Sequence, residues 1–192
     1  MTIYFTSDLH LGHKNIIEYT GRPYKNIDEM DEVLISNWNA RVTAYDEVYI
    51  LGDVALCPVD RAIQCLRRMN GIKYLVEGNH DYRNLKNPEF KSQFVWVKPI
   101  FELELADDEV RKGRRRIVMC HYAMRVWNKS HHGSYHLYGH SHGSLPDDPN
   151  ALSMDVGVDA RGYVPVSIHE VHKLMSKKNW KPIDHHRYRG QE

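Results

Sequence analysis

Polar fragments rich in aspartate and histidine recur at five places in this chain, each after an apolar segment typical of a buried strand. In order, they are Asp8-Leu9-His10, Gly52-Asp53, Gly78-Asn79-His80-Asp81, Cys120-His121 and Gly139-His140-Ser141-His142. Side chains at the ends of neighbouring strands meet at one edge of a sheet, so ligands far apart in the sequence can converge there. The chain is therefore expected to be an α/β protein with a polar site at a sheet edge.

The order of elements supports this expectation. The hydrophobic pattern predicts strands over 3–6, 47–51 and 73–76, with helices between them. The first helix carries a 3.6-residue stripe from Met30 to Arg41, and Asn26 with Glu29 resembles its capping box. The second helix is expected over 60–69, between Pro58 and Gly71. Strand and helix alternating in this way are typical of a largely parallel sheet.

The second half of the chain is richer in strands. Extended segments are predicted over 94–97, 100–105, 116–120, 136–138 and 153–156. Ser167 and Glu170 form a capping box for a last helix, whose apolar face contains Ile168, Val171, Leu174 and Met175. A four-layer α-β-β-α sandwich, with two mixed sheets packed together and helices outside, accommodates both halves.

Length and composition set the remaining limits. The 192 residues fit one domain, expected over 1–183 with a C-terminal tail over 184–192. No apolar run approaches the roughly 20 residues that cross a bilayer, and the first residues lack a basic signal-peptide region, which together predict a cytoplasmic protein. The formal net charge of +1 gives no global attraction to nucleic acid or anionic lipid. Three cysteines without a CxxC pair indicate reduced core residues.

The residue types in the five fragments suit metal binding. Asp8 and His10 stand two apart, so they can lie on the same side of a strand end and bind one ion. Asp53 follows a glycine, and its two carboxylate oxygens can bridge two cations. Further donors are Asn79, His121, His140 and His142. Nitrogen and oxygen donors without sulfur favour Mn, Fe, Zn or Ni over a structural zinc. Taken singly, Asp8 or Asp53 is more typical of a cap or a turn and His121 of a buried histidine beneath a loop, but the ordered set favours metal.

The ordered fragments DxH, GD, GNHD, H and GHxH, spanning residues 8 to 142, resemble the calcineurin-like metallophosphoesterase superfamily, in a small, uncapped single-domain form. The resemblance implies one metal held by Asp8, His10, Asp53 and His142. It implies a second metal held by Asp53, Asn79, His121 and His140. Two divalent ions are thus expected, Mn first, with Fe, Zn or Ni as alternatives. Many members carry a further acidic residue soon after the GD pair, whereas Val54 to Pro58 contain none.

The same resemblance implies a mechanism. A hydroxide bridging the two ions is expected to attack phosphorus, because two adjacent cations lower the pKa of a shared water and neutralise developing charge. His80 would protonate or hydrogen-bond the leaving oxygen, and Asp81 would fix the tautomer of His80 and support its charge. The expected function is hydrolysis of phosphodiesters or phosphomonoesters, of small molecules or nucleotides.

Several residues and functions stay open at this level. His13, Arg22, Arg125 and His132 are candidate substrate contacts. The basic run Arg111 to Arg116 would support a nuclease on the same dinuclear site, whereas its alternative is an exposed hairpin balanced by Asp107-Asp108-Glu109. A third hypothesis is a binding scaffold that has lost most of its catalysis. The sequence does not indicate an oligomeric state.

Overall fold

The first of two mixed sheets carries most of the parallel strands. The computed structural model describes residues 1–106 and 113–184. Its five-stranded sheet has the order β4-β3-β2-β1-β9, with β1 to β4 parallel and β9 antiparallel to β1. The strands are β1 (Ile3–Thr6), β2 (Glu47–Ile50), β3 (Ile72–Val76), β4 (Val97–Lys98) and β9 (Val166–Ser167). The three predicted strands of the first half are confirmed.

The second sheet has four strands in the order β5-β6-β7-β8. They are β5 (Ile100–Ala106), β6 (Arg114–Cys120), β7 (Tyr135–Tyr138) and β8 (Ser153–Asp155). β5 is antiparallel to β6, whereas β6, β7 and β8 are parallel. The α/β class with two mixed sheets is thus as predicted.

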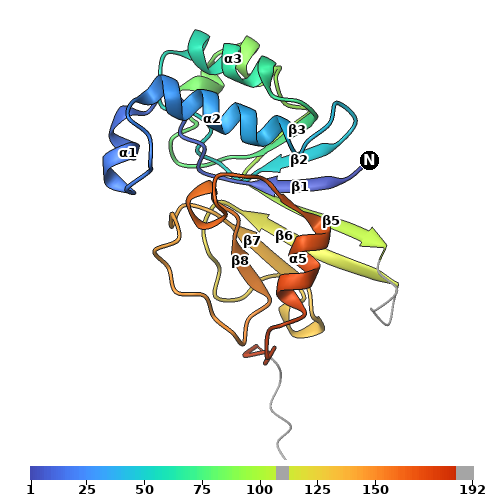
Figure 1. Cartoon of the computed structure of the whole chain (residues 1–192). Coiled ribbons are helices and arrows are strands. Elements are labelled where there is room, and N and C mark those ends of the chain that lie inside the picture. Colours follow the sequence, from blue (N-terminus) through green and yellow to red (C-terminus); the bar gives the residue numbers. More distant parts are fainter. Residues whose placement is uncertain (107–112, 185–192) are drawn as a thin grey trace, which may run out of the picture.

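Helices lie outside this pair of sheets. Figure 1 shows α1 to α3 gathered on one side of β1 to β3, and α5 beside the second sheet. The helices are α1 (Lys14–Tyr19), α2 (Ile27–Asn39), α3 (Val59–Arg68), α4 (Pro88–Lys91) and α5 (Ile168–Met175), with 3-10 turns η1 (Asn84–Lys86), η2 (Ser130–His132) and η3 (Val158–Ala160). The capping box of Ser167 and Glu170 is present. At α2, the Asn26 side chain caps the helix as predicted, but the capping box is incomplete. The Glu29 side chain accepts a hydrogen bond from the amide of Lys25 instead of the amide of Asn26.

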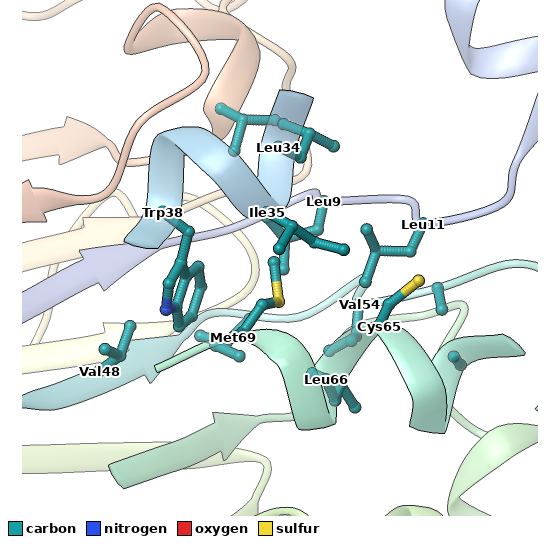
Figure 2. Close-up of a cluster of buried hydrophobic side chains, with 14 of the residues drawn as sticks. Leu9, Leu11, Leu34, Ile35, Trp38, Val48, Val54, Cys65, Leu66 and Met69 are labelled. Atoms are coloured by element: carbon teal, nitrogen blue, oxygen red, sulfur yellow. The ribbon is translucent and has the colours of Figure 1, made fainter. Parts of the chain in front are cut away.

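Two buried cores hold the layers together. The first lies between the first sheet and helices α2 and α3, where Trp38, Ile35 and Leu66 pack closely, as Figure 2 shows. The second joins the two sheets and includes Phe5, Leu51, Val76, Ile117, Met119 and Leu137, with Val171 and Met175 of α5. Both faces of the first sheet are therefore covered, which explains why its strands read as nearly continuous apolar runs.

One predicted strand is wrong in its extent. The segment 94–97 was expected to be extended, but β4 begins only at Val97. Phe94 instead closes a turn after α4, where its amide donates to the carbonyl of Lys91 and its ring packs edge-on against Phe90, 5.5 Å away. Burial of this aromatic pair outweighs the β-propensity of the segment.

Parts of two other sequence predictions lie outside the described residues. These are 107–112, which include the start of the basic run and its acidic counterpart, and 185–192 of the predicted tail. Within residues 1–106 and 113–184, no helix combines the length and apolar character that a membrane crossing needs.

Candidate dinuclear metal centre

The predicted ligands do meet at one edge of the paired sheets. Each stands in the loop that follows the carboxyl end of a strand, namely β1, β2, β3, β6 or β7. The first two loops continue the parallel pairing beyond their strands, since the amide of Asp8 donates to Gly52 O and that of His10 to Asp53 O, both at 3.0 Å. Backbone hydrogen bonds therefore hold Asp8, His10 and Asp53 together before any ligand binds.

Two clusters of potential metal-binding atoms result. In one, donor atoms of Asp8, His10 and His142 all lie within 4.8 Å of one another, and in the other the same is true of Asp53, His121 and His140.

Asp53 stands between the two clusters. Its Oδ2 atom is 3.5 Å from Nε2 of His10 and 3.5 Å from Nε2 of His121. Asn79 joins the second cluster, with its Oδ1 atom 3.0 Å from Nε2 of His121. A single carboxylate oxygen thus faces nitrogen donors of both clusters, which is the position a bridging ligand requires.

Two buried atoms in the first cluster lack any hydrogen-bond partner among the described residues, Oδ1 of Asp8 and Nε2 of His10. Asp8 is fully buried and His10 nearly so. Leaving such groups unsatisfied costs about 1–3 kcal/mol each, so native proteins rarely tolerate it without an ion or water. An oxygen and a nitrogen donor left free side by side fit a divalent cation.

Hydrogen bonds orient two of the histidines toward the site. Nδ1 of His121 lies 2.7 Å from Leu51 O, and because a carbonyl only accepts, Nδ1 carries the proton and the Nε2 lone pair is free. Nδ1 of His142 is 2.7 Å from Oδ2 of Asp159, which leaves Nε2 free in the same way. Partners of this kind are typical of metal-binding histidines. Asp159 was missed in the sequence analysis, because η3 carries no local signal that links it to His142.

The backbone of the site is strained. Asp8, His10, Asp53, His140 and His142 all adopt left-handed conformations, with φ between 48° and 66°. Residues with a side chain rarely do so, at a cost of about 1–2 kcal/mol each. Five such residues in one site indicate that the surrounding hydrogen bonds hold them there for function rather than for stability.

Asp81 has a different role from the one expected. Its buried carboxylate accepts hydrogen bonds from the amides of Gly78 (2.8 Å), Asp53 (3.0 Å) and Val54 (2.9 Å). No hydrogen bond joins its side chain to the His80 ring among the described residues, so the prediction that it fixes the His80 tautomer is wrong. Asp81 instead ties the loop after β3 to the loop after β2 and so positions Asp53.

His80 lies at the entrance to the site. Its amide donates to Oδ1 of Asp53 at 2.9 Å, and its half-exposed ring places Nε2 4.0 Å from Oδ2 of the same residue. The ring borders an open cleft of about 710 Å³, whose walls include His10, His13, Tyr19, His140 and His142. A molecule in this cleft would reach both clusters and His80 together.

Burial and neighbouring charges shift the pKa values of the candidate ligands. Burial raises the pKa of Asp8 to about 7 and lowers the pKa of His10 to about 3. Burial also raises the pKa of Asp53, but the neighbouring His121 outweighs it and brings that pKa down to about 2. His10 is therefore neutral and Asp53 ionised near pH 7, which are the forms that bind metal.

The four candidate substrate contacts do not converge. His13 lines the cleft, with its Nδ1 atom 3.4 Å from that of His10. Arg22 is buried, and its guanidinium donates to both carboxylate oxygens of Asp159 at 2.8 Å and to the carbonyls of Asp8 and Leu9. Arg125 lines a separate pocket near the C-terminal segment, and His132 lies in η2. Arg22 therefore supports the metal-site loops and is not placed to contact substrate.

The described part of the basic run lies far from the site. Arg114 begins β6, whereas the site begins just after Cys120 at the other end, six residues or about 20 Å along the strand. Arg116 pairs with Glu102 at 2.8 Å and also with Glu104, and Arg114 lies 3.8 Å from Glu104. Glutamates of β5 thus offset much of this positive charge. Arg111 and Lys112 are outside the described residues.

Comparison with known proteins identifies the family. Residues 1–160 match the model of the calcineurin-like phosphoesterase family. The uncharacterised protein MJ1445 of Methanocaldococcus jannaschii is 30% identical over 182 residues, which cover 91% of this chain and 92% of that protein. The Gene 66 protein of Mycobacterium phage L5 is 26% identical over 195 residues, covering 90% of this chain and 93% of that protein.

A solved structure agrees in fold. The protein of unknown function AQ665 from Aquifex aeolicus superposes with a TM-score of 0.64 at 22% identity, covering 90% of this chain and 98% of that one. A two-sheet α/β fold with paired Asp and His clusters defines a metallophosphoesterase-like protein. This chain belongs to the calcineurin-like phosphoesterase family.

Proposed function

We propose that this protein is a hydrolase of phosphoric esters that depends on two divalent metal ions. The position of Asp53 is the main support for this proposal, because its Oδ2 atom faces Nε2 of His10 and Nε2 of His121 at 3.5 Å each. The unpartnered buried atoms of Asp8 and His10 add to it. The second observation is not explained by stability, since burying unsatisfied donors and acceptors destabilises the fold.

The donor set divides into two sites that share Asp53. Asp8, His10, Asp53 and His142 would hold one ion, and Asp53, Asn79, His121 and His140 the other. Bound ions would supply an activated water and neutralise charge on the phosphoryl oxygens. The donors suit Mn, with Fe, Zn or Ni as alternatives.

His80 is proposed to act on the leaving group. Its ring is half exposed at the cleft, and the bond from its amide to Asp53 fixes it next to the candidate metal sites. In hydrolysis, water adds to phosphorus, the bond from phosphorus to the leaving oxygen breaks, and that oxygen takes a proton, which His80 can donate. His80 would therefore affect turnover far more than metal affinity.

The cleft allows small substrates without selecting an ester class. Its volume of about 710 Å³ lies in the range of small-molecule sites, and its lining includes Ile16, Tyr19 and Leu56. Phosphodiesters and phosphomonoesters of small molecules or nucleotides are therefore the proposed substrates.

Hydrolysis assays on metal-stripped protein test the proposal. Bis-p-nitrophenyl phosphate and p-nitrophenyl phosphate would be assayed separately with added Mn, Ni, Zn or Mg. We expect release of p-nitrophenol only with metal. Asp53→Ala should lose bound metal and activity together, whereas His80→Ala should keep the metal and lose roughly 100-fold or more in turnover.

His169→Ala is the matched control, because His169 is an exposed histidine on α5, and it should leave activity unchanged. A protein that binds two ions but releases no product from either ester would instead support a binding scaffold.

A further inference from the structure

A second, smaller pocket adjoins the cleft at His80. This pocket has a volume of about 290 Å³, and its walls include Leu56, His80, Arg83 and Asn84. Leu56 and His80 also line the main cleft. His80 therefore borders two neighbouring spaces, a larger one that includes candidate metal ligands and a smaller one lined by Arg83, which we call the narrow arm.

Arg83 brings a positive charge to the narrow arm, and none of the described carboxylates pairs with it. Its Nε atom donates to the hydroxyl of Tyr82 at 2.8 Å, and its guanidinium lies 5.7 Å from the centre of that ring. Within residues 1–106 and 113–184 it contacts no carboxylate, whereas Arg67 binds Glu89 at 2.6 Å and Arg61 binds Asp31 at 2.6 Å. The terminal nitrogens of Arg83 thus remain available to a ligand.

The backbone that carries Arg83 is fixed. Asn84 is buried, and its side chain donates to Ala55 O at 3.2 Å, which anchors this segment to the loop after β2. The amide of Leu85 donates to Asp81 O at 3.0 Å. Asp81 in turn accepts from three site amides, so the backbone of Arg83 is held relative to His80 and Asp53.

We propose that the narrow arm binds an anionic group on the leaving portion of the substrate, with Arg83 as the residue that binds it. This inference rests on the proposed function, in which the leaving oxygen lies at His80, so that atoms beyond that oxygen extend past the His80 ring. A guanidinium fork matches a carboxylate or a phosphate through two parallel hydrogen bonds. The substrate class is therefore a phosphoester whose alcohol portion carries a carboxylate or a second phosphate.

Matched aryl phosphates test this preference. The probes are 4-carboxyphenyl phosphate, 4-phosphonophenyl phosphate and the neutral 4-carbamoylphenyl phosphate, each also prepared as its methyl diester so that ester class does not decide the result. We expect the wild-type protein with metal to prefer at least one anionic probe over the neutral one. Arg83→Ala should lower kcat/KM for that probe about tenfold, mainly through KM, and should change the neutral probe less than twofold. Whether the carboxylate or the phosphonate is preferred distinguishes the two anions.

Two further variants make the test specific. Lys86→Ala removes the same charge from the same segment, but Lys86 does not line the narrow arm, so its kcat/KM values should stay near wild type. Arg83→Lys should recover only part of the preference, because an ammonium cannot form the paired hydrogen bonds.

The inference would be overturned if Arg83→Ala lowered kcat/KM equally for anionic and neutral probes. It would also be overturned if the wild-type protein showed no preference for an anionic probe. Metal-dependent hydrolysis would remain intact in either case. Absence of hydrolysis of every probe with every metal would overturn the proposed function instead.

Discussion

At the scale of single residues, the candidate site depends on side chains that are not themselves candidate ligands. Asp159 orients His142 and binds the buried Arg22, whose guanidinium also holds the carbonyls of Asp8 and Leu9. Asp81 similarly joins the loops after β2 and β3 through hydrogen bonds from their backbone amides. The candidate ligands were predictable from the sequence because their spacing after strands is local. Asp159, Arg22 and Asp81 were missed or given other roles because their partners lie in other loops.

The pairing of Asp159 predicts a pH dependence of stability. Burial alone would raise the pKa of Asp159, but the contacts with His142 and Arg22 lower it to about 2. A carboxyl whose pKa falls on folding stabilises the protein above its unfolded pKa of about 4, and this contribution disappears as pH drops toward 2. In metal-free protein, the Asp159 contribution should be about 2 kcal/mol at pH 6.

Urea unfolding of wild type and Asp159→Asn from pH 6 to pH 2 measures this effect. The free-energy gap between the two proteins should narrow as pH falls. A gap that stays constant or widens would show that the ionised carboxylate does not provide the stabilisation.

At the scale of elements, tight loops after parallel strands bring the site together. The left-handed backbone at Asp8, His10, Asp53, His140 and His142 turns the loops after β1, β2 and β7 within a few residues of their strands. Strand positions were predictable from apolar runs, and α2, α3 and α5 from their periodicity. The short helix α4 was not predicted, and Phe94, which was expected in a strand, instead pairs with Phe90.

Gly52 makes one of these turns possible. Its φ is 92°, and a Cβ atom there would lie 2.5 Å from Nδ1 of His121 and 2.6 Å from Cα of Gly78. Gly52→Ala should therefore combine backbone strain with a steric overlap that displaces His121, destabilise the protein by more than about 2 kcal/mol and weaken metal binding.

Gly21→Ala provides the control, because Gly21 has a φ of 65° but open space around its Cα. It should cost only the backbone strain, about 1 kcal/mol, and leave metal binding unchanged. Thermal or urea unfolding together with metal titration compares the two variants. Equal effects in both would show that close packing at Gly52 does not shape the site.

At the scale of the whole molecule, the packing of the two sheets brings the five loops of the candidate site to one edge. The inter-sheet core of Phe5, Leu51, Met119 and Leu137 sets the second sheet against the first, so that His121 and His140 meet Asp53. The sequence predicted this convergence, because strand ends in an α/β fold share an edge. The narrow arm was not predicted from the sequence, because Arg83 lies in no recognisable motif. Only the structure places Arg83 in the pocket beside His80.

Metal stoichiometry tests the central claim most directly. Metal-stripped protein would be dialysed against Mn, Fe, Zn or Ni in turn, and the bound metal measured by elemental analysis, with thermal unfolding as a second readout. The account predicts two ions per chain with at least one of these metals and a rise in Tm, because a ligand that binds only the folded state stabilises it. Asp53→Ala should retain fewer than two ions. A wild-type protein that binds no metal, or never more than one ion per chain, would contradict the dinuclear site.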